Sequence, residues 1–269
     1  MTTVTYTLSD SATMTRRNVR RLVRYPSMTL LLVGMPVVFL LLFVYVFGGQ
    51  LSHGLGPQLA GGHVGRAAYL NYVTPGILLL TVAAAVQGTA IVVAMDMTGG
   101  IIDRFRTMAI ARSSVLTGHV LAALIQTMTG LAIVVGFALA LALGFRPTAG
   151  VMRWLAAFSM LALFSFALVW LATALGLAAK SVETASNTPM FLTLLVFLGS
   201  GFVPAGTMPA GLAQFARYQP FTTVTETLRG LLTGTPIGTN ALGAVAWSLG
   251  IASVSVIWAM HLYRNRGAA

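Results

Sequence analysis

Six long apolar stretches, separated by shorter polar segments, organise the chain. Each is about 18 to 29 residues long, the length that a helix needs to cross a lipid bilayer. We therefore expect transmembrane helices over residues 28–47, 71–95, 115–143, 154–179, 185–202 and 240–262. Pro36, inside the first stretch, predicts a kink in that helix.

Residues 96–112 form a long polar interruption between the second and third stretches. Its apolar side chains recur at helical spacing, and its polar side chains fill the opposite side. The apolar set is Ile101, Ile102, Phe105, Met108 and Ala109, and the polar set is Asp103, Arg104, Arg106 and Thr107. Gly99 and Gly100 allow a sharp turn just before them. The pattern predicts a short amphipathic helix that projects toward a soluble partner, with a solvated loop as the alternative.

The N-terminal segment carries five arginines along one side of a predicted helix over residues 11–25. They are Arg16, Arg17, Arg20, Arg21 and Arg24. We expect this helix to lie along the membrane surface, with its arginines at the lipid headgroups, and to end at Pro26. Residues 1–10 are expected to be disordered. A signal peptide is not expected, because the apolar run that follows exceeds the ~7–15 residues of such peptides.

Composition indicates an integral membrane protein. Hydrophobic residues make up 57% of the chain and charged residues only 8%, whereas a soluble domain carries roughly 25% charged residues. The net charge of +11 would suggest nucleic-acid binding in a soluble protein. Here the arginines flank apolar stretches, so anionic lipid and the excess of basic residues on cytoplasmic loops explain them better. We expect no nucleic-acid partner.

The distribution of basic residues predicts the orientation in the cell membrane. Six crossings place both termini on one side, together with residues 96–112 and Lys180, and this side carries eleven lysines and arginines against five on the other. The richer side should be cytoplasmic. Residues 204–238 then face outward. Within them, residues 220–232 predict a helix with a capping box from Thr223 to Glu226 and an ion pair between Glu226 and Arg229.

The sequence lacks the residues that energy-converting and catalytic sites need. A P-loop requires a lysine after glycine, but the chain's single lysine, Lys180, follows Leu-Ala-Ala. Ion-coupled carriers keep charged residues within their spans, whereas every carboxylate here lies at the end of a span or in a loop. His119 is predicted to be a hydrogen-bonded packing residue, with a proton relay as the alternative. Without paired catalytic carboxylates or metal-ligand spacing, we expect neither an enzyme nor a metal site.

The predicted spans mix scattered polar groups with many methionine and phenylalanine side chains, which suits an amphiphilic or lipid-like cargo better than an ion. The candidate path residues are Gln87, Gln126, Met190, Phe197 and Phe202. For each of these residues singly, packing against lipid is the alternative. Small residues at four-residue intervals also predict close helix packing, although such stripes arise by chance in an alanine-rich chain. They are Ala132, Gly136, Ala140 and Gly144.

Several segments resemble the daunorubicin-resistance-type permeases of ATP-binding cassette exporters. They are residues 20–26 (Arg-Arg-Leu-Val-Arg-Tyr-Pro), 36–49 (beginning Pro-Val-Val-Phe), 69–76 (Tyr-Leu-Asn-Tyr-Val-Thr-Pro-Gly), 100–112, 202–209 and 219–222 (Gln-Pro-Phe-Thr). No single segment is specific, but the combination is, and the resemblance covers nearly the whole chain.

The resemblance implies an all-α integral membrane protein with six transmembrane helices, an N-terminal interfacial helix, a cytoplasmic coupling helix and short extracellular helices between spans five and six. Its parts would be a cytoplasmic segment over residues 1–27, a permease domain over 28–263 and a tail over 264–269. The coupling helix, residues 98–112, would sit in a cleft of a separate ATPase subunit that binds ATP and Mg²⁺, so no cofactor is expected in this chain. Its contact residues would be Gly99, Gly100, Ile101, Ile102, Asp103, Arg104, Phe105, Arg106, Met108 and Arg112.

The resemblance further implies that two permease copies, identical or related, enclose a path for hydrophobic or amphiphilic compounds such as drugs, antibiotics or lipid-like molecules. Two alternatives stay open. One is the same architecture exporting a glycan or a lipid-linked polymer, and the other is an ion-coupled secondary carrier working alone. A carrier would lose transport with the proton gradient and would be indifferent to ATP.

Overall fold

The computed structural model describes residues 3–24, 26–49, 66–99, 112–140 and 149–265, and within these ranges every regular element is a helix. The helices are, in chain order, α1 (Thr3–Arg24), α2 (Pro26–Leu41), η1 (Leu42–Phe47), α4 (Arg66–Thr98), α6 (Arg112–Ala140), α7 (Val151–Ala178), α8 (Val182–Asn187), α9 (Met190–Phe197), η4 (Ala205–Thr207), α10 (Ala210–Tyr218), α11 (Pro220–Thr233) and α12 (Asn240–Asn265). The expected all-α fold is confirmed.

Among the described residues, five helices are long and apolar enough to cross a membrane. They are Leu30–Phe47, Ala68–Thr98, Leu116–Leu139, Val151–Ala178 and Asn240–Asn265. These match the first four and the last of the predicted spans to within a few residues, because the hydropathy that defines a span is a property of the local sequence. The chain is a multi-pass membrane protein.

The predicted fifth span, residues 185–202, is not a single helix. α8 has six residues and α9 has eight, with a break between them at Thr188 and Pro189. Neither can cross a core of about 30 Å at about 1.5 Å per residue. Pro189 has no N–H to continue the hydrogen bonds of α8, and the next helix, α9, begins directly after it at Met190. The prediction of one continuous helix is wrong, and the count of six crossings stays a prediction.

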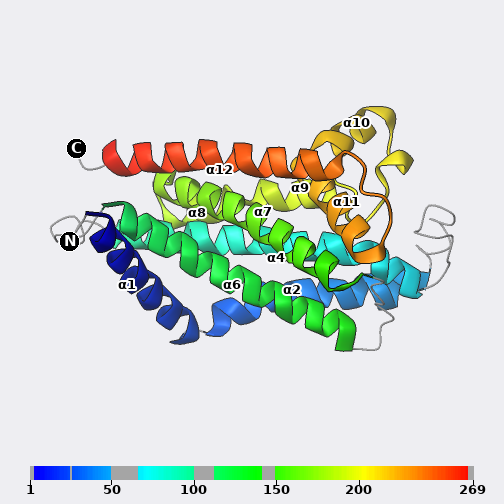
Figure 1. Ribbon diagram of the computed structural model, residues 1–269, viewed down its shortest axis with the longest axis horizontal. Coiled ribbons are helices and arrows are strands. Elements are labelled where there is room, and N and C mark those ends of the chain that lie inside the picture. Colours follow the sequence, from blue (N-terminus) through cyan, green and yellow to red (C-terminus); the bar gives the residue numbers. More distant parts are fainter. Residues whose placement is uncertain (1–2, 25, 50–65, 100–111, 141–148, 266–269) are drawn as a thin grey trace.

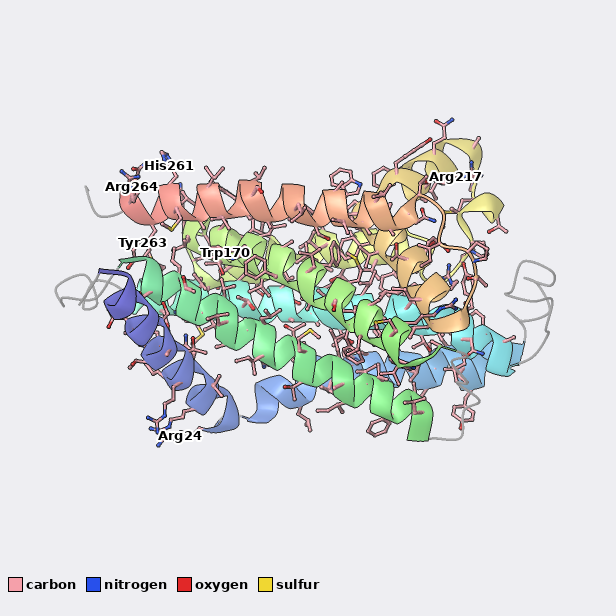
Figure 2. All side chains as sticks on the ribbon, in the orientation of Figure 1. Arg24, Trp170, Arg217, His261, Tyr263 and Arg264 are labelled. Atoms are coloured by element: carbon pink, nitrogen blue, oxygen red, sulfur yellow. The ribbon has the colours of Figure 1, made fainter. Side chains whose placement is uncertain are left out.

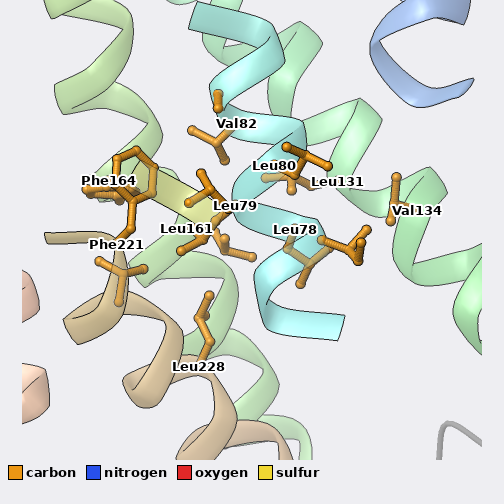
Figure 3. Close-up of a cluster of buried hydrophobic side chains, with 14 of the residues drawn as sticks. Leu78, Leu79, Leu80, Val82, Leu131, Val134, Leu161, Phe164, Phe221 and Leu228 are labelled. Carbon is orange, nitrogen blue, oxygen red and sulfur yellow. The ribbon is translucent and has the colours of Figure 1, made fainter. Parts of the chain in front are cut away.

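α4 lies at the centre of the bundle, and α2, α6, α7, α8, α9 and α11 pack around it (Figure 1). In the apolar window of α4, 72% of positions are buried, against 22% for the first and last membrane helices. Leucines and valines of α4 gather with Leu131 of α6, Phe164 of α7 and Phe221 of α11 (Figure 3). The rings of Phe164 and Phe221 meet edge to face, with their centroids 5.3 Å apart. Because lipid is as apolar as these side chains, close packing rather than the hydrophobic effect holds such helices together.

The two ends of the bundle carry different parts of the chain. The C-terminal ends of α4, α7 and α12 lie at one end together with α1 and the start of α6, whereas α10 and α11 lie at the opposite end (Figure 1). Exposed side chains of His261 and Arg264 mark the first end, and Arg217 marks the second (Figure 2). The helix ends that flank residues 100–111 therefore lie on the same side as both ends of the described chain, as the predicted alternation of spans requires.

The N-terminal helix begins at Thr3, so the expected disorder of residues 1–10 is wrong for residues 3–10. α1 packs along α6 through a buried face that includes Ser11, Met14 and Asn18. A Cβ added to Gly118 of α6 would lie 2.5 Å from the Cβ of Met14, so the two helices touch where α6 carries no side chain. This side of α1 therefore contacts protein rather than lipid.

Candidate functional site

Asp96, near the C-terminal end of α4, is a buried carboxylate with 1% of its surface exposed. Its Oδ2 lies 3.2 Å from Nη2 of Arg17 on α1 and 3.3 Å from Nε2 of His119 on α6. A negative charge at a helix C-terminus opposes the helix dipole, and a buried charge is costly unless it is paired. Arg17 and His119, which come from other helices, offset both of these costs by pairing with the carboxylate. Asp96 thereby joins α1, α4 and α6.

Arg17, one of the five arginines predicted to face the lipid headgroups, instead faces Asp96. Arg16, Arg20 and Arg24 lie exposed at four-residue intervals. Arg17 is only 38% exposed and turns toward Asp96. The side chain of Arg21 lies outside the described residues. Reasoning from sequence missed the pair, although a carboxylate inside the last turn of an apolar span is a signal that a cationic partner is needed.

His119 was expected to be either a packing residue or a proton relay. It is 6% exposed and its Nε2 faces Asp96. This position agrees with the packing interpretation, because the imidazole helps to hold α6 against α4 at the end of the bundle where residues 100–111 depart.

The predicted partner-docking segment begins at Gly99, which is exposed and whose N–H donates to the carbonyl of Met95 at 2.9 Å. Most of the predicted contact residues lie outside the described residues: Gly100, Ile101, Ile102, Asp103, Arg104, Phe105, Arg106 and Met108. Arg112 is the first residue of α6, and its side chain is not described. The structure therefore places the two helices that flank the segment, joined by Asp96 and His119.

A second candidate site is a group of five phenylalanines, which we call the phenylalanine cluster. Its members are Phe39 of α2, Phe43 and Phe47 of η1, Phe197 of α9, and Phe202 in the turn after α9. Phe202 stacks on Phe43 and on Phe197, with centroids 4.7 and 4.8 Å apart. Phe202 is 4% exposed, whereas Phe47 and Phe197 are 42% and 38% exposed. The cluster therefore has a packed interior and an open edge.

The first three rings share a signal in the sequence. Phe39, Phe43 and Phe47 recur at four-residue intervals, and neighbouring rings lie 6.3 and 5.9 Å apart. The cluster was not predicted from these three residues, because a phenylalanine in an apolar span is equally compatible with facing lipid. From Leu42 to Phe47 the helix has π geometry. This geometry is rare in proteins, and where it occurs it is often at a functional site.

The five candidate path residues separate into two groups. Phe197 and Phe202 stack on one another, and Met190 lies exposed on the same helix as Phe197. Gln87 instead donates from its Nε2 to the carbonyl of Ser186, 3.1 Å away, and so joins α4 to the end of α8. Gln126 is half-buried on α6, a helix that contributes no ring to the phenylalanine cluster.

The cluster offers apolar stacking surfaces. Aromatic rings bind planar apolar groups face to face or edge to face. No group of three or more metal-ligating side chains occurs among the described residues. The open edge of the cluster therefore presents aromatic rings on which a planar apolar group could stack.

Comparison with known proteins extends over most of the chain. A family model described as ABC-2 type transporter matches residues 11–233. Over 261 residues the chain is 30% identical to the daunorubicin resistance ABC transporter permease protein DrrB1 of Streptomyces coeruleorubidus, covering 96% of this chain and 88% of the relative. It is 24% identical over 202 residues to the probable doxorubicin resistance ABC transporter permease protein DrrC of Mycobacterium tuberculosis, covering 72% of each. Asp96 and the phenylalanine cluster both lie inside the range that the family model matches.

Proposed function

This chain belongs to the ABC-2 type transporter family, and from that membership we propose that it is the membrane subunit of an exporter for hydrophobic or amphiphilic compounds of the drug or antibiotic class. A separate ATPase subunit, which binds ATP and Mg²⁺, supplies the energy. The observation that carries the proposal is the similarity along 96% of the chain to a daunorubicin resistance permease. The single lysine lies outside any P-loop, in agreement with a subunit that depends on a partner for ATP hydrolysis.

In this proposal the end of the bundle that carries α1 and Asp96 faces the cytoplasm, because basic residues concentrate in the segments assigned to that side. The ATPase subunit binds the segment between α4 and α6. Asp96 ties both helices to α1, so a displacement delivered between α4 and α6 reaches α1 as well. The exposed Arg16, Arg20 and Arg24 contact anionic headgroups of the inner leaflet.

α8 and α9 together form the remaining crossing. Both pack against α4 and follow one another along it (Figure 1). An interrupted helix is tolerated in a membrane where neighbouring protein groups bond the freed backbone. Six crossings then place both termini in the cytoplasm and α10 and α11 outside.

The phenylalanine cluster lines the export path, which two copies of the permease, identical or related, enclose. The exposed edges of Phe47 and Phe197 face the path, and so does the exposed Met190 at the start of α9. Stacking of a planar cargo on these rings contributes about 0.5–1.5 kcal/mol per ring pair beyond area burial, which is enough to select cargo and weak enough to allow release.

The docking part of the proposal is tested by reversing two charges. In the double variant Arg104→Glu with Arg106→Glu, we expect the ATPase subunit to stop co-purifying and export of daunorubicin from cells to be lost, because the contacts of a cation with its partner become repulsive. The measurements are pull-down yield and cellular daunorubicin accumulation. Arg153→Glu with Arg217→Glu, an equal charge change at exposed positions, is the control and should leave both unchanged. Normal co-purification and export in the first variant would contradict the docking role.

The path is tested at its open edge. Phe197→Ala removes two ring contacts, to Phe39 and Phe202, and should lower daunorubicin export about threefold to tenfold by the loss of one stacking surface. The matched control is Phe191→Ala, on the same helix, where the ring is 48% exposed and has no ring contact among the described residues. Equal loss of export in the two variants, at equal amounts of protein, would remove the cluster from the path.

A further inference from the structure

Between α9 and η4 the chain runs through a turn, residues 198–203, whose central residues 199–202 are buried and lie between the phenylalanine cluster and α11. Ser200 and Phe202 are 2% and 4% exposed. Irregular backbone inside an apolar surrounding leaves N–H and C=O groups that must find partners. The helices that supply these hydrogen-bond partners therefore fix the position of the turn.

Both backbone groups of Ser200 are bonded by distant helices. Its carbonyl accepts from Nη2 of Arg229 on α11 at 2.8 Å and from the hydroxyl of Tyr72 on α4 at 3.1 Å. Its N–H donates to Oγ1 of Thr222 on α11 at 3.2 Å. The turn therefore has its position dictated by α4 and α11 rather than by its own local structure.

Arg229 is the centre of these contacts. Only 7% of it is exposed, and its Nη2 also donates to the carbonyl of Tyr72 at 3.1 Å. Nη1 pairs with Oε1 of Glu226, one turn earlier and 31% exposed, at 2.5 Å. The guanidinium lies 3.8 Å from the centroid of the Tyr72 ring, a cation–π contact. One planar group thus serves two carbonyls, a carboxylate and a ring, which a lysine ammonium could not do with the same geometry.

The turn is also pressed onto α4 by backbone contact. A Cβ added to Gly76 would lie 2.7 Å from the carbonyl oxygen of Gly201, so the two backbones touch. Gly201 is followed directly by Phe202, whose ring stacks on Phe43 and Phe197. A single residue, Gly201, separates Ser200, whose carbonyl Arg229 holds, from Phe202, the innermost ring of the cluster.

We propose that Arg229 is a positioning residue for the phenylalanine cluster: by holding the Ser200 carbonyl it sets where Phe202 stacks, and thereby which cargo the cluster accepts. The effect on cargo rests on the proposed function, whereas the effect on the position of Phe202 does not. Arg229→Lys keeps the positive charge but loses the planar guanidinium and its several hydrogen bonds. The variant therefore separates the effect of the charge from the effect of the hydrogen-bond geometry.

Position is measured by cross-linking, for which the chain is suited because it contains no cysteine. In the variant Phe43→Cys with Phe202→Cys, a short bismethanethiosulfonate reagent should link the two thiols in native membranes. Adding Arg229→Lys should lower the yield several-fold. The control pair Phe39→Cys with Phe197→Cys, whose native rings lie 6.0 Å apart, should link equally in both backgrounds. An unchanged yield at positions 43 and 202 would overturn the proposal, whether or not the chain exports drugs.

Selectivity is measured in inverted membrane vesicles that hold the full chain and its ATPase subunit. The probes are ethidium, which is planar and aromatic, and dodecyltrimethylammonium, which is not. We expect Arg229→Lys to reduce the ratio of ethidium to dodecyltrimethylammonium transport at least about fivefold, Tyr72→Phe to reduce it less, and the exposed control Arg217→Lys to leave it unchanged.

A double-variant comparison separates positioning from a general structural role. If Arg229 acts through Phe202, then Arg229→Lys should have no further effect on the transport ratio once Phe202→Ala is present. Additive effects, or equal loss of both probes in Arg229→Lys, would overturn the link to selectivity. Failure of the unaltered chain to transport either probe would count against the proposed function, and the cross-linking result would still decide the positioning role.

Discussion

Asp96→Ala is expected to reduce export at least about tenfold while the complex continues to hydrolyse ATP. The carboxylate of Asp96 is the group that Arg17 of α1 and His119 of α6 share. Without it the N-terminal helix loses its ionic link to the two helices that flank residues 100–111. Motion of α4 would then reach α1 only indirectly, through the packing of α1 along α6.

The expected free-energy cost of Asp96→Ala follows from how deeply the Asp96–Arg17 ion pair is buried. Removing one partner of a buried ion pair costs about 3–5 kcal/mol. Arg17 is 38% exposed, and water screens its charge, so we expect about 2 kcal/mol for the link between α1 and the bundle. That is enough to weaken the link between α1 and α4, while the packing of α1 along α6 stays intact.

The measurement is the ratio of transported cargo to ATP hydrolysed in proteoliposomes that contain the purified complex. Asp96→Ala should lower this ratio, with co-purification of the ATPase subunit retained. The control is Glu183→Gln, an exposed carboxylate on α8 that makes no ion pair among the described residues. A normal ratio for Asp96→Ala, at normal protein amount, would refute the coupling role.

Gly176→Leu is expected to lower the yield of folded protein at least about fivefold, through overpacking at a helix contact. A Cβ at position 176 of α7 would lie 2.7 Å from the carbonyl oxygen of Ala90 and 2.9 Å from the Cβ of Val93, both on α4. A backbone oxygen inside a helix cannot move aside cheaply. In lipid, small residues allow the close approach that holds helices together, so α7 would be forced away from the central helix.

The matched control for this change is Gly136→Leu on α6. Gly136 is exposed, and a Cβ there would meet nothing within 4 Å. Yield is measured as the monodisperse fraction of detergent-extracted protein by size-exclusion chromatography. Comparable yields of the two leucine variants would mean that the approach of α7 to α4 does not limit folding.

Gly136 and Gly176 also show that residue spacing does not predict which helix face contacts another helix. The small-residue stripe that includes Ala132 and Gly136 predicts a close helix contact, but both residues lie exposed within this chain. The close contacts occur instead at Gly76, Gly118 and Gly176. Spacing along one helix says which residues share a face. It does not say which face another helix meets.

The segment between α9 and α12 likewise shows which features local sequence predicts and which it does not. The predicted helix over residues 220–232 is confirmed as α11, and the pairing of Glu226 with Arg229 is confirmed. The capping box is wrong, because the helix begins at Pro220 and Glu226 is bound to Arg229. Arg229 was predicted to be a surface charge but is buried. Local sequence could not show this, because Arg229 bonds the carbonyl of Tyr72, which lies 157 positions away.

The sequence by itself determined the membrane class, the positions of five long helices and the family, because hydropathy, span length and motif order are sums over neighbouring residues. The tertiary structure alone decided that Asp96 meets Arg17 across 79 positions, that five phenylalanines form one cluster, and that the turn at Ser200 is held by α11. In an apolar chain almost every side chain is compatible with either lipid or protein. Only the three-dimensional approach of the helices distinguishes the two, and only where they meet does a buried charge find its partner.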